Sequence, residues 1–339
     1  MSDTIEHVGL VVIGRNEGPR LTRCLASVAG GPAPVVYVDS ASTDDSVERA
    51  RAAGVHVVPL DDSRPLSAAR GRNAGFEHLA TAHPSLRYVQ FIDGDCEIQA
   101  DWLEHAAAAL DEHPEWAIVC GRLRERERHA SIYNRLCDLE WDRPAGEIAA
   151  CGGIFMIRID AFRQVDGFNE CIAAGEEPDL CWRLREAGWL IHRLPADMAT
   201  HDANMHQFSQ WWRRAVRSGH AYAEAAWRHG RESDRFGVRE SASIWFWSFG
   251  WPFVILLLSW PTGGWALLGF AAYPLHAMKI FRAQRTRGRS SSDAWLYAVF
   301  CVIGKWAQWT GQLKFLCRKL MRRKPRIIEY KQPTMDRTG

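Results

Sequence analysis

The sequence predicts an α/β fold with a mostly parallel sheet, followed by helices that associate with a membrane. Short apolar runs alternate with amphipathic segments over roughly the first 200 residues, and acidic side chains follow several of these runs. Residues 241–278 contain no Lys, Arg, Asp or Glu, which is typical of membrane helices. We therefore expect three parts, at 1–230, 241–280 and 290–339.

The strands are predicted from short apolar runs that are rich in β-branched residues. These runs are 8–13, 35–38, 55–60, 88–92, 117–119, 152–159 and 189–194. Helical periodicity and capping residues predict the helices between and after them. These helices lie at 19–29, 45–54, 67–80, 101–110, 176–187 and 208–227. Residues 122–150 are charged and without a clear period, so we expect an insertion or a mobile segment there.

Polar side chains gather where the first, second and fourth of these strands end. They are Asn16, Glu17, Asp39, Asp93 and Asp95. Ligands of parallel α/β sheets bind outside the carboxyl ends of the strands. We therefore expect these five side chains to share one edge of the sheet and to form a binding site.

Asp93-Gly-Asp95 is the clearest local sign of chemistry. Two carboxylates at a strand end can share a hard divalent cation, and Mg²⁺ typically takes one or two carboxylates together with substrate phosphates. Such a cation would neutralise a diphosphate leaving group. The plain alternative is a polar turn. Asp39 can accept from a base N–H or a ribose hydroxyl; its alternative is a helix cap, but Ser42 and the residues after it already supply caps.

Glu176, Glu177 and Asp179 crowd the start of a predicted helix. The helix dipole favours acids there, which is the structural alternative. Three acids exceed what a cap needs, so one of them is a candidate general base for an acceptor hydroxyl. Arg72 is a candidate for contact with phosphate, and its alternative is a solvated helix face.

Taken in order, several motifs resemble family 2 glycosyltransferases, which have the GT-A fold. The motifs are Val11-Val-Ile-Gly-Arg-Asn16-Glu17, Val38-Asp39-Ser-Ala-Ser-Thr-Asp44, Arg72-Asn-Ala-Gly75, Asp93-Gly-Asp95 and Gly175-Glu-Glu-Pro-Asp-Leu180-Cys-Trp-Arg-Leu184. The resemblance covers roughly residues 7–203. It implies an inverting transfer from a nucleotide-sugar donor, with one base and no covalent intermediate.

The resemblance also implies roles for single residues. Asp39 would read the base, Glu17 would contact the nucleoside, and Arg72 would approach the diphosphate. Asp93 would lie by the ribose, and Asp95 would hold Mg²⁺ or Mn²⁺. A last set completes the implied site: Gly152 and Gly153 beside the donor sugar, His201 near the metal or diphosphate, and Glu177 as the base, where the family usually has Asp.

Gln210 and Arg213 match part of a Q-x-x-R-W motif of processive synthases, but Arg214 replaces the final Trp. Single transfer is therefore the better interpretation, and the predicted membrane segment favours a polyprenyl-linked or glycan acceptor. A nicotinamide dehydrogenase is disfavoured because Gly14-Arg-Asn-Glu-Gly18 lacks G-x-G-x-x-G. A nucleotidyltransferase and a non-catalytic membrane adaptor remain as alternatives.

The charge-free segment fits two short spans joined at Pro261, Gly263 and Gly264, and its alternative is a buried hairpin of a soluble core. The segment 279–339 has 15 Lys or Arg against 3 acids, so it carries +12 and residues 1–278 carry −10 of the net +2. Arginines directly after the hairpin predict a cytoplasmic side at the inner membrane.

The helix at 294–315 is amphipathic and predicts an interfacial position, with a third span ranked second. The basic run 318–326 would then bind anionic headgroups. The acidic body lacks a basic stripe, so nucleic acid is not expected as a partner. No signal peptide is visible, and nine cysteines without a C-x-x-C pair favour a reducing compartment.

Overall fold

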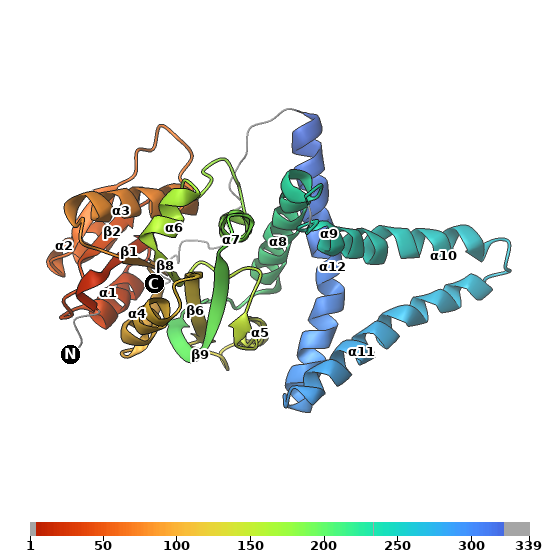
Figure 1. Cartoon of the computed structure of the whole chain (residues 1–339). Coiled ribbons are helices and arrows are strands. Elements are labelled where there is room, and N and C mark those ends of the chain that lie inside the picture. Colours follow the sequence, from red (N-terminus) through yellow and green to blue (C-terminus); the bar gives the residue numbers. More distant parts are fainter. Residues whose placement is uncertain (1–4, 233, 322–339) are drawn as a thin grey trace. The chain divides into compact units, whose positions relative to one another are not determined.

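The computed structural model describes residues 5–232 and 234–321, and these form two compact units (Figure 1). Unit 1 comprises the described residues up to Arg128 together with 140–204. Unit 2 comprises 129–139 together with the described residues from Met205 onward. The long helix α8 (Phe208–His229) belongs to unit 2. The predicted domain boundary near residue 230 came from the sequence pattern and not from contacts in the structure, so it stays a prediction.

Unit 1 is built on one mixed sheet with the strand order β3-β2-β1-β4-β8-β6-β9-β5, and β7 pairs with β9. The strands are β1 (Val8–Gly14), β2 (Val35–Asp39), β3 (His56–Pro59), β4 (Tyr88–Asp93), β5 (Cys96–Ile98), β6 (Trp116–Glu125), β7 (Gly146–Glu147), β8 (Phe155–Arg158) and β9 (Leu190–His201). The helices of this unit are α1 (Pro19–Val28), α2 (Ser46–Ala52), α3 (Ala68–Ala82), α4 (Trp102–Glu112), α6 (Ile159–Gln164) and α7 (Glu176–Glu186).

The prediction of a mostly parallel sheet is confirmed only in part, because the sheet is mixed. Strands β1 to β4 pair in parallel, and so do β6 and β9. In contrast, β8 runs antiparallel to both β4 and β6, and β5 and β7 run antiparallel to β9. The chain leaves β6 at its carboxyl end and enters β8 from that same edge of the sheet. Because no crossover returns the chain to the opposite edge first, β8 runs antiparallel to β6. An apolar run shows that a strand exists but says nothing about its direction.

The buried strand β1 lies at the centre of the parallel part, between β2 and β4. Its side chains are apolar at successive positions because both faces of the sheet are covered there. Helix α3 lies very close to it at Gly75, where a Cβ would be 2.4 Å from Val11. This close packing brings the N-terminal part of α3, with Arg72, toward the carboxyl edge of the sheet.

Residues 122–150 are ordered structure, which corrects the expectation of an insertion or mobile segment. Strand β6 continues to Glu125, α5 covers Ile132–Trp141, and β7 pairs with β9. The charged side chains of this stretch interrupt the apolar pattern, so the sequence did not predict the end of the strand. The structure shows that β6 keeps pairing with β9 along this polar end. Strand β9 is also longer than predicted and ends at His201.

Unit 2 is helical. Its helices are α8, α9 (Val238–Trp245), a π-helical turn η2 (Phe246–Gly250), α10 (Trp251–Ser259), the 3-10 helix η3 (Trp265–Ala271), α11 (Ala272–Thr286) and α12 (Ser291–Leu320). The long helices α8 and α12 approach each other most closely at two glycines. A Cβ at Gly219 would lie 1.9 Å from the carbonyl oxygen of Gln308, and one at Gly311 would lie 2.0 Å from that of Val216.

Among the described residues one helix, Val238–Ser259, is long and apolar enough to cross a membrane. After a tight turn, η3 leads into α11, which carries Lys279 and Arg282. The predicted pair of membrane spans therefore stays a prediction. Gln312 lies within the helix predicted to be interfacial, and the structure buries its polar side chain in α12. The predicted basic run extends past residue 321, outside the described part of the chain.

Candidate active site

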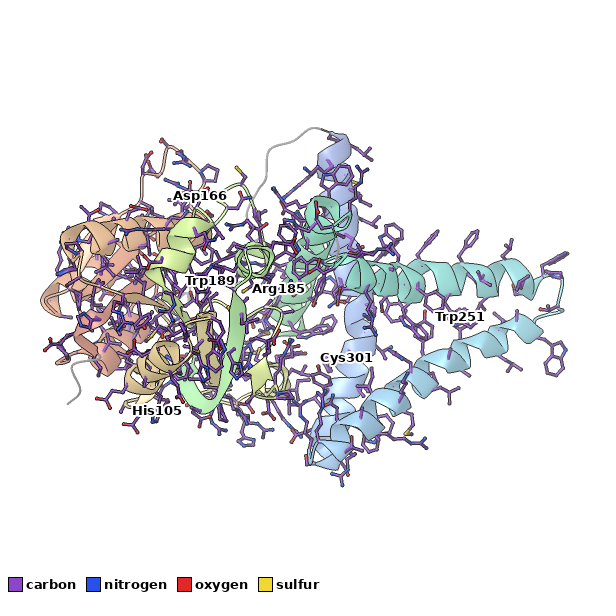
Figure 2. The ribbon with its side chains drawn as sticks, in the orientation of Figure 1. His105, Asp166, Arg185, Trp189, Trp251 and Cys301 are labelled. Atoms are coloured by element: carbon purple, nitrogen blue, oxygen red, sulfur yellow. The ribbon has the colours of Figure 1, made fainter. Side chains whose placement is uncertain are left out.

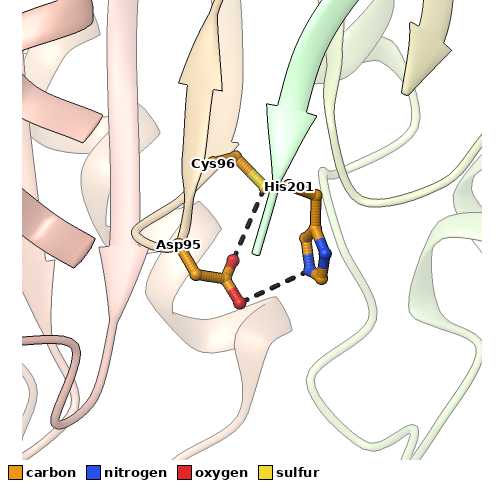
Figure 3. A group of neighbouring side chains, drawn as sticks. All are labelled: Asp95, Cys96 and His201. Atoms are coloured by element: carbon orange, nitrogen blue, oxygen red, sulfur yellow. Dashed lines mark hydrogen bonds and ion pairs between the residues drawn. The ribbon is translucent and has the colours of Figure 1, made fainter. Parts of the chain in front are cut away.

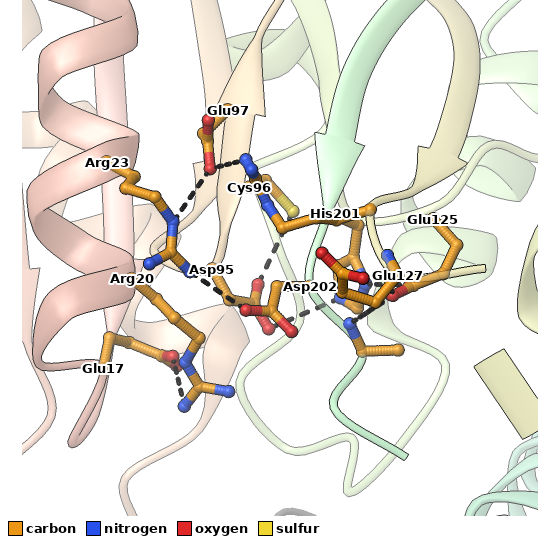
Figure 4. A network of polar contacts seen from close by, with 12 residues as sticks. Glu17, Arg20, Arg23, Asp95, Cys96, Glu97, Glu125, Glu127, His201 and Asp202 are labelled. Carbon is orange, nitrogen blue, oxygen red and sulfur yellow. Dashed lines mark hydrogen bonds and ion pairs between the residues drawn. The ribbon is translucent and has the colours of Figure 1, made fainter. Parts of the chain in front are cut away.

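The strand register explains why the predicted residues share an edge. Gly14 at the end of β1 pairs with Asp39 of β2, and Ile13 pairs with Asp93 of β4. The loops that follow these strands therefore start side by side, and the expectation of a common edge is confirmed. Figure 4 shows part of the polar network that results, from Glu17 to His201.

Asp39 is held at the end of β2 by two donors. The Tyr37 hydroxyl donates to one carboxylate oxygen at 3.0 Å, and the backbone N–H of Ser42 donates to the other at 2.9 Å. The carboxylate is buried. Burial, reinforced by the charge of Asp39, raises the pKa of Tyr37 above its ordinary value, so the phenol stays protonated as the donor.

Asn16 and Glu17 shape the loop after β1. Asn16 has a positive φ of 56°, and its side-chain oxygen accepts from the backbone N–H of Thr43 at 2.7 Å, which joins this loop to the one after β2. The backbone N–H of Glu17 donates to Ser46 at the start of α2, and its carboxylate forms an ion pair of 2.8 Å with Arg20. These contacts fix the loops beside Asp39.

Arg72 is the hub of the second part of the site. One guanidinium nitrogen donates to Asp93 at 3.1 Å, and another donates to Glu177 at 3.1 Å and to Glu176 at 3.4 Å. The Arg72 side chain is only 2% exposed. Its solvated-face alternative is therefore wrong, because α3 directs it between the end of β4 and the first turn of α7.

Opposing effects act on the charge of Arg72. Burial disfavours the guanidinium, but the carboxylates of Glu177, Asp93 and Glu176 outweigh it and raise the pKa of Arg72 above its usual value. The arginine is therefore permanently charged. Three carboxylates around one cation leave negative charge that a further cation or a proton would balance.

Gly153 lies directly against this hub. A Cβ at this position would be 2.5 Å from a guanidinium nitrogen of Arg72, 3.0 Å from Glu177 and 3.3 Å from Asp93. Only glycine fits between these groups and the backbone. A Cβ at the neighbouring Gly152 would meet no atom within 4 Å, so the two predicted glycines differ in what they contact.

Asp95 and His201 meet because β5 pairs with β9, with Cys96 opposite His201 in the register. The Nε2 atom of His201 lies 3.4 Å from an Asp95 carboxylate oxygen, and the Cys96 thiol lies 3.5 Å from the other oxygen (Figure 3). These three residues are the group of His, Cys and acidic side chains whose ligand atoms come within 4.8 Å of one another among the described residues.

Sequence reasoning missed Glu125, the residue that backs His201. One of its carboxylate oxygens lies 3.5 Å from the Nδ1 atom of His201, and Glu125 also accepts from the backbone N–H of Ala203 at 3.1 Å (Figure 4). Trp141 packs edge-on against the same imidazole at 4.9 Å. Glu125 follows the apolar part of β6, so its place at a strand end was the available signal.

The donors around Asp95 fit a divalent cation. The Asp95 carboxylate is buried, the imidazole nitrogen nearest to it belongs to His201, and Glu125 lies behind the other nitrogen. A carboxylate behind a ligating histidine orients the ring and fixes its tautomer. An imidazole in the set favours Mn²⁺ over Mg²⁺, which prefers oxygen ligands alone.

The remaining predicted residues lie elsewhere. Asp179 forms an ion pair of 2.9 Å with Arg183, whose other nitrogen donates to the backbone of Gly167, so its carboxylate is engaged in the packing of α7. Gln210 and Arg213 belong to α8 in unit 2, where Gln210 caps the helix by accepting from the backbone of Gln207 at 2.9 Å.

The sheet order, the strand-end carboxylates and the Arg72 hub define an α/β fold of the GT-A type. Its fold is similar to that of the mannosyltransferase PcManGT from Pyrobaculum calidifontis, solved in complex with GDP-Man and Mn²⁺. The TM-score is 0.52 and the identity 19%, over 93% of this chain and 86% of that one.

The sequence comparisons indicate a family. Residues 10–165 match the family model described as glycosyl transferase family 2, so this part of the chain is similar to that family. It is also 27% identical, over 324 residues, to the pre-mycofactocin glycosyltransferase of two Mycobacterium tuberculosis strains, CDC 1551 / Oshkosh and ATCC 25618 / H37Rv. The match covers 92% of this chain but 64% of the length of these relatives.

Proposed function

We propose that this protein transfers a sugar from a nucleoside-diphosphate sugar to a hydroxyl group of an acceptor, with inversion and with the help of a divalent cation. The observation that carries the proposal is the convergence of Arg72, Asp93, Glu177 and Gly153 at one point of the sheet edge. The Arg72 guanidinium can attract a diphosphate, and the absence of a side chain at Gly153 leaves room for the donor. The Glu177 carboxylate can then serve as the base next to the donor sugar.

The donor nucleoside fits the loops after β1 and β2. Asp39 has two oxygens whose positions are fixed by Tyr37 and Ser42, and each oxygen keeps a further lone pair for a base N–H or a ribose hydroxyl. Asp93, whose side chain is 35% exposed, is open enough to accept from the ribose while it holds Arg72. The donor then extends toward Asp95 and Gly153.

Asp95 and His201 would hold Mn²⁺ or Mg²⁺ on the diphosphate, and the ion would supply charge neutralisation for the leaving group. The use of a divalent cation, though not the choice of its ligands, agrees with the PcManGT structure, which was solved in complex with GDP-Man and Mn²⁺. Glu125 is the positioning residue for His201. Arg72 contributes a second, protein-borne positive charge that does not depend on the metal.

Glu177 is the proposed general base. It is the more exposed of the two glutamates that contact Arg72, with 16% of its side chain accessible against 4% for Glu176. Glu177 would take the proton of the acceptor hydroxyl while that oxygen bonds to the anomeric carbon. The bond from this carbon to the diphosphate breaks in the same step, and the electron pair leaves with the nucleoside diphosphate.

For the acceptor we propose a polyprenyl-linked or other glycan at the cytoplasmic face of the inner membrane. The apolar helices of unit 2 support attachment to lipid. The name of the curated relatives suggests a second acceptor to test, pre-mycofactocin.

The decisive experiment measures binding and turnover of a panel of nucleoside-diphosphate sugars by the full chain in detergent, with Mn²⁺, with Mg²⁺ and with EDTA. We expect one donor to bind in a metal-dependent way. Asp95→Asn should abolish the metal-dependent binding of the donor. Glu177→Gln should retain donor binding and lose transfer. Metal-independent turnover, or no donor binding by a folded chain, would contradict the proposal.

A further inference from the structure

The segment from Phe246 to Leu275 in unit 2 exposes apolar side chains on every side. Six of the ten residues from Trp251 to Trp260 are large apolar side chains exposed by more than two fifths, and Trp260 reaches 92%. On the returning leg, the exposed fraction is 75% for Trp265 and 68% for Leu275. A helix that is apolar all round is either buried in protein or surrounded by lipid.

The two legs meet at a tight turn and hold each other. The Trp251 indole N–H donates to the carbonyl oxygen of Gly269 at 3.1 Å, and a Cβ at Gly269 would lie 2.9 Å from Ile255. Trp251 is labelled in Figure 2. Ile255 is the buried residue of α10. The segment is therefore a formed hairpin whose inner contacts are protein and whose outer surface is apolar.

The base of the outward leg is held by α12. Lys305 donates to the Ser243 hydroxyl at 3.2 Å, and Trp245 packs against Trp309 with ring centres 5.8 Å apart. Phe249 also stacks on Trp309, with ring centres 6.0 Å apart, so the free part of this leg begins at Gly250. From there to Trp260 a helix rises only about 15 Å.

The returning leg is too short to cross a bilayer. Only the 14 residues from Trp265 to Met278 separate the turn from the exposed Lys279. Half of them form the 3-10 helix η3 and half belong to α11, which together rise about 24 Å. The hydrocarbon core is about 30 Å thick. The legs also diverge from the turn, so both cannot stand perpendicular to the membrane (Figure 1).

The turn between the legs satisfies its own backbone N–H groups. Every backbone N–H from Thr262 to Leu267 has an acceptor within the hairpin, and Pro261 has no N–H. The Thr262 hydroxyl donates to Leu258 at 2.6 Å and accepts from the N–H of Ala266 at 3.1 Å. Water would serve these groups at a far membrane surface, whereas hydrocarbon requires internal partners.

We propose that residues 246–275 form a re-entrant membrane hairpin, which enters the bilayer and returns to the same face without exposing its turn on the other side. Its occupant is lipid hydrocarbon, with the basic residues after it, among them Arg282 and Arg285, at the headgroups. This inference rests on the membrane attachment proposed above, and it replaces two full spans with one insertion.

The test uses Trp265→Cys in the full chain, with Cys301→Ser and Cys317→Ser to remove the partly exposed thiols of unit 2. The exposed Cys171 of unit 1 remains as a native reporter of the side on which that unit lies. Sealed vesicles of each orientation are treated with a membrane-impermeant maleimide, and the modified peptides are identified by mass spectrometry. Leu268→Cys is the second position if the first variant does not fold.

For a re-entrant hairpin, Cys171 is modified in one orientation and the introduced thiol in neither until detergent is added. A fluorophore attached there should also be quenched by acyl-chain nitroxides. Modification in the orientation opposite to that of Cys171 would show a full crossing and overturn the proposal. Modification together with Cys171, without quenching, would show that the hairpin lies outside the membrane. Donor turnover is measured separately, so failure of the transferase proposal would not affect these results.

Discussion

At the scale of single residues, the site depends on close approaches that leave no room for a side chain. Gly153 lies against Arg72, Glu177 and Asp93 at once, whereas Gly152 beside it contacts nothing within 4 Å of a Cβ. The two glycines look equivalent in the sequence. They should respond differently to the same substitution.

Gly153→Ala should lower kcat/KM by roughly 10- to 100-fold, because the added methyl pushes Arg72 and Glu177 out of position by a fraction of an ångström to about 1 Å. The melting temperature should change little by comparison. Steady-state kinetics with the donor that the nucleotide-sugar panel identifies would measure the effect. Gly152→Ala is the matched control, and an equal loss in both variants would show that the contact with Arg72 is not the cause.

At the scale of elements, α8 and α12 pack through glycines that differ in the space around them. A Cβ at Gly311 would lie 2.0 Å from a backbone oxygen of α8, whereas one at Gly304 on the same helix would be 3.7 Å from the Trp211 ring. Backbone cannot move aside as a flexible side chain can.

We expect Gly311→Ala to destabilise unit 2 by about 2 kcal/mol or more, because the two helices must separate to admit the methyl. Gly304→Ala should be neutral, or stabilising by up to about 1 kcal/mol from helix propensity. Thermal denaturation of both variants in the same detergent would compare them. A tolerated Gly311→Ala would mean that the helices are not in the close contact described.

His220 should make the stability of the same helix pair depend on pH. It is buried in α8, and desolvation, with Arg318, Arg217 and Lys314 nearby, lowers its pKa from the ordinary 6.5 to about 4. The Glu224 carboxylate is 3.8 Å from its Nδ1 atom. Between pH 6.5 and 4 the unfolded chain binds a proton that the folded chain does not.

The stability from His220 is therefore present above pH 6.5 and lost as the pH falls toward 4, by up to roughly 3 kcal/mol. The wild-type melting temperature should drop more between pH 7.5 and pH 5 than that of His220→Gln, which has no proton to gain. Parallel pH profiles of the two proteins would contradict this assignment.

At the scale of the whole molecule, membrane attachment should depend on the hairpin. Leu257 is 62% exposed on α10, and an aspartate within hydrocarbon costs about 3 kcal/mol. Leu257→Asp should therefore weaken binding of the full chain to anionic vesicles by roughly 100-fold. Ile132→Asp, at an exposed apolar residue of α5, is the control and should bind as the wild type does. Flotation with vesicles measures the binding of both variants. Equal losses of binding would show that the hairpin is not the part of the chain that attaches to the membrane.

The alternation of strands and helices in unit 1, and the shared edge of Asn16, Glu17, Asp39 and Asp93, could be predicted from the sequence alone. These features are local, because periodicity marks each strand and its end marks where the polar residue falls. The sequence also located the apolar segment, because absence of charge over 38 residues needs no fold to be seen.

The contacts between distant segments could be learned only from the folded chain. The direction of β8 and the approach of Gly153 to Arg72 join residues dozens of positions apart. So do the pairings of β9 with β5 and with β6, which bring His201 to Asp95 and Glu125 to His201. Such contacts follow from sheet order and backbone packing. A one-dimensional pattern constrains neither, because the same apolar strand can pair with several partners in either direction.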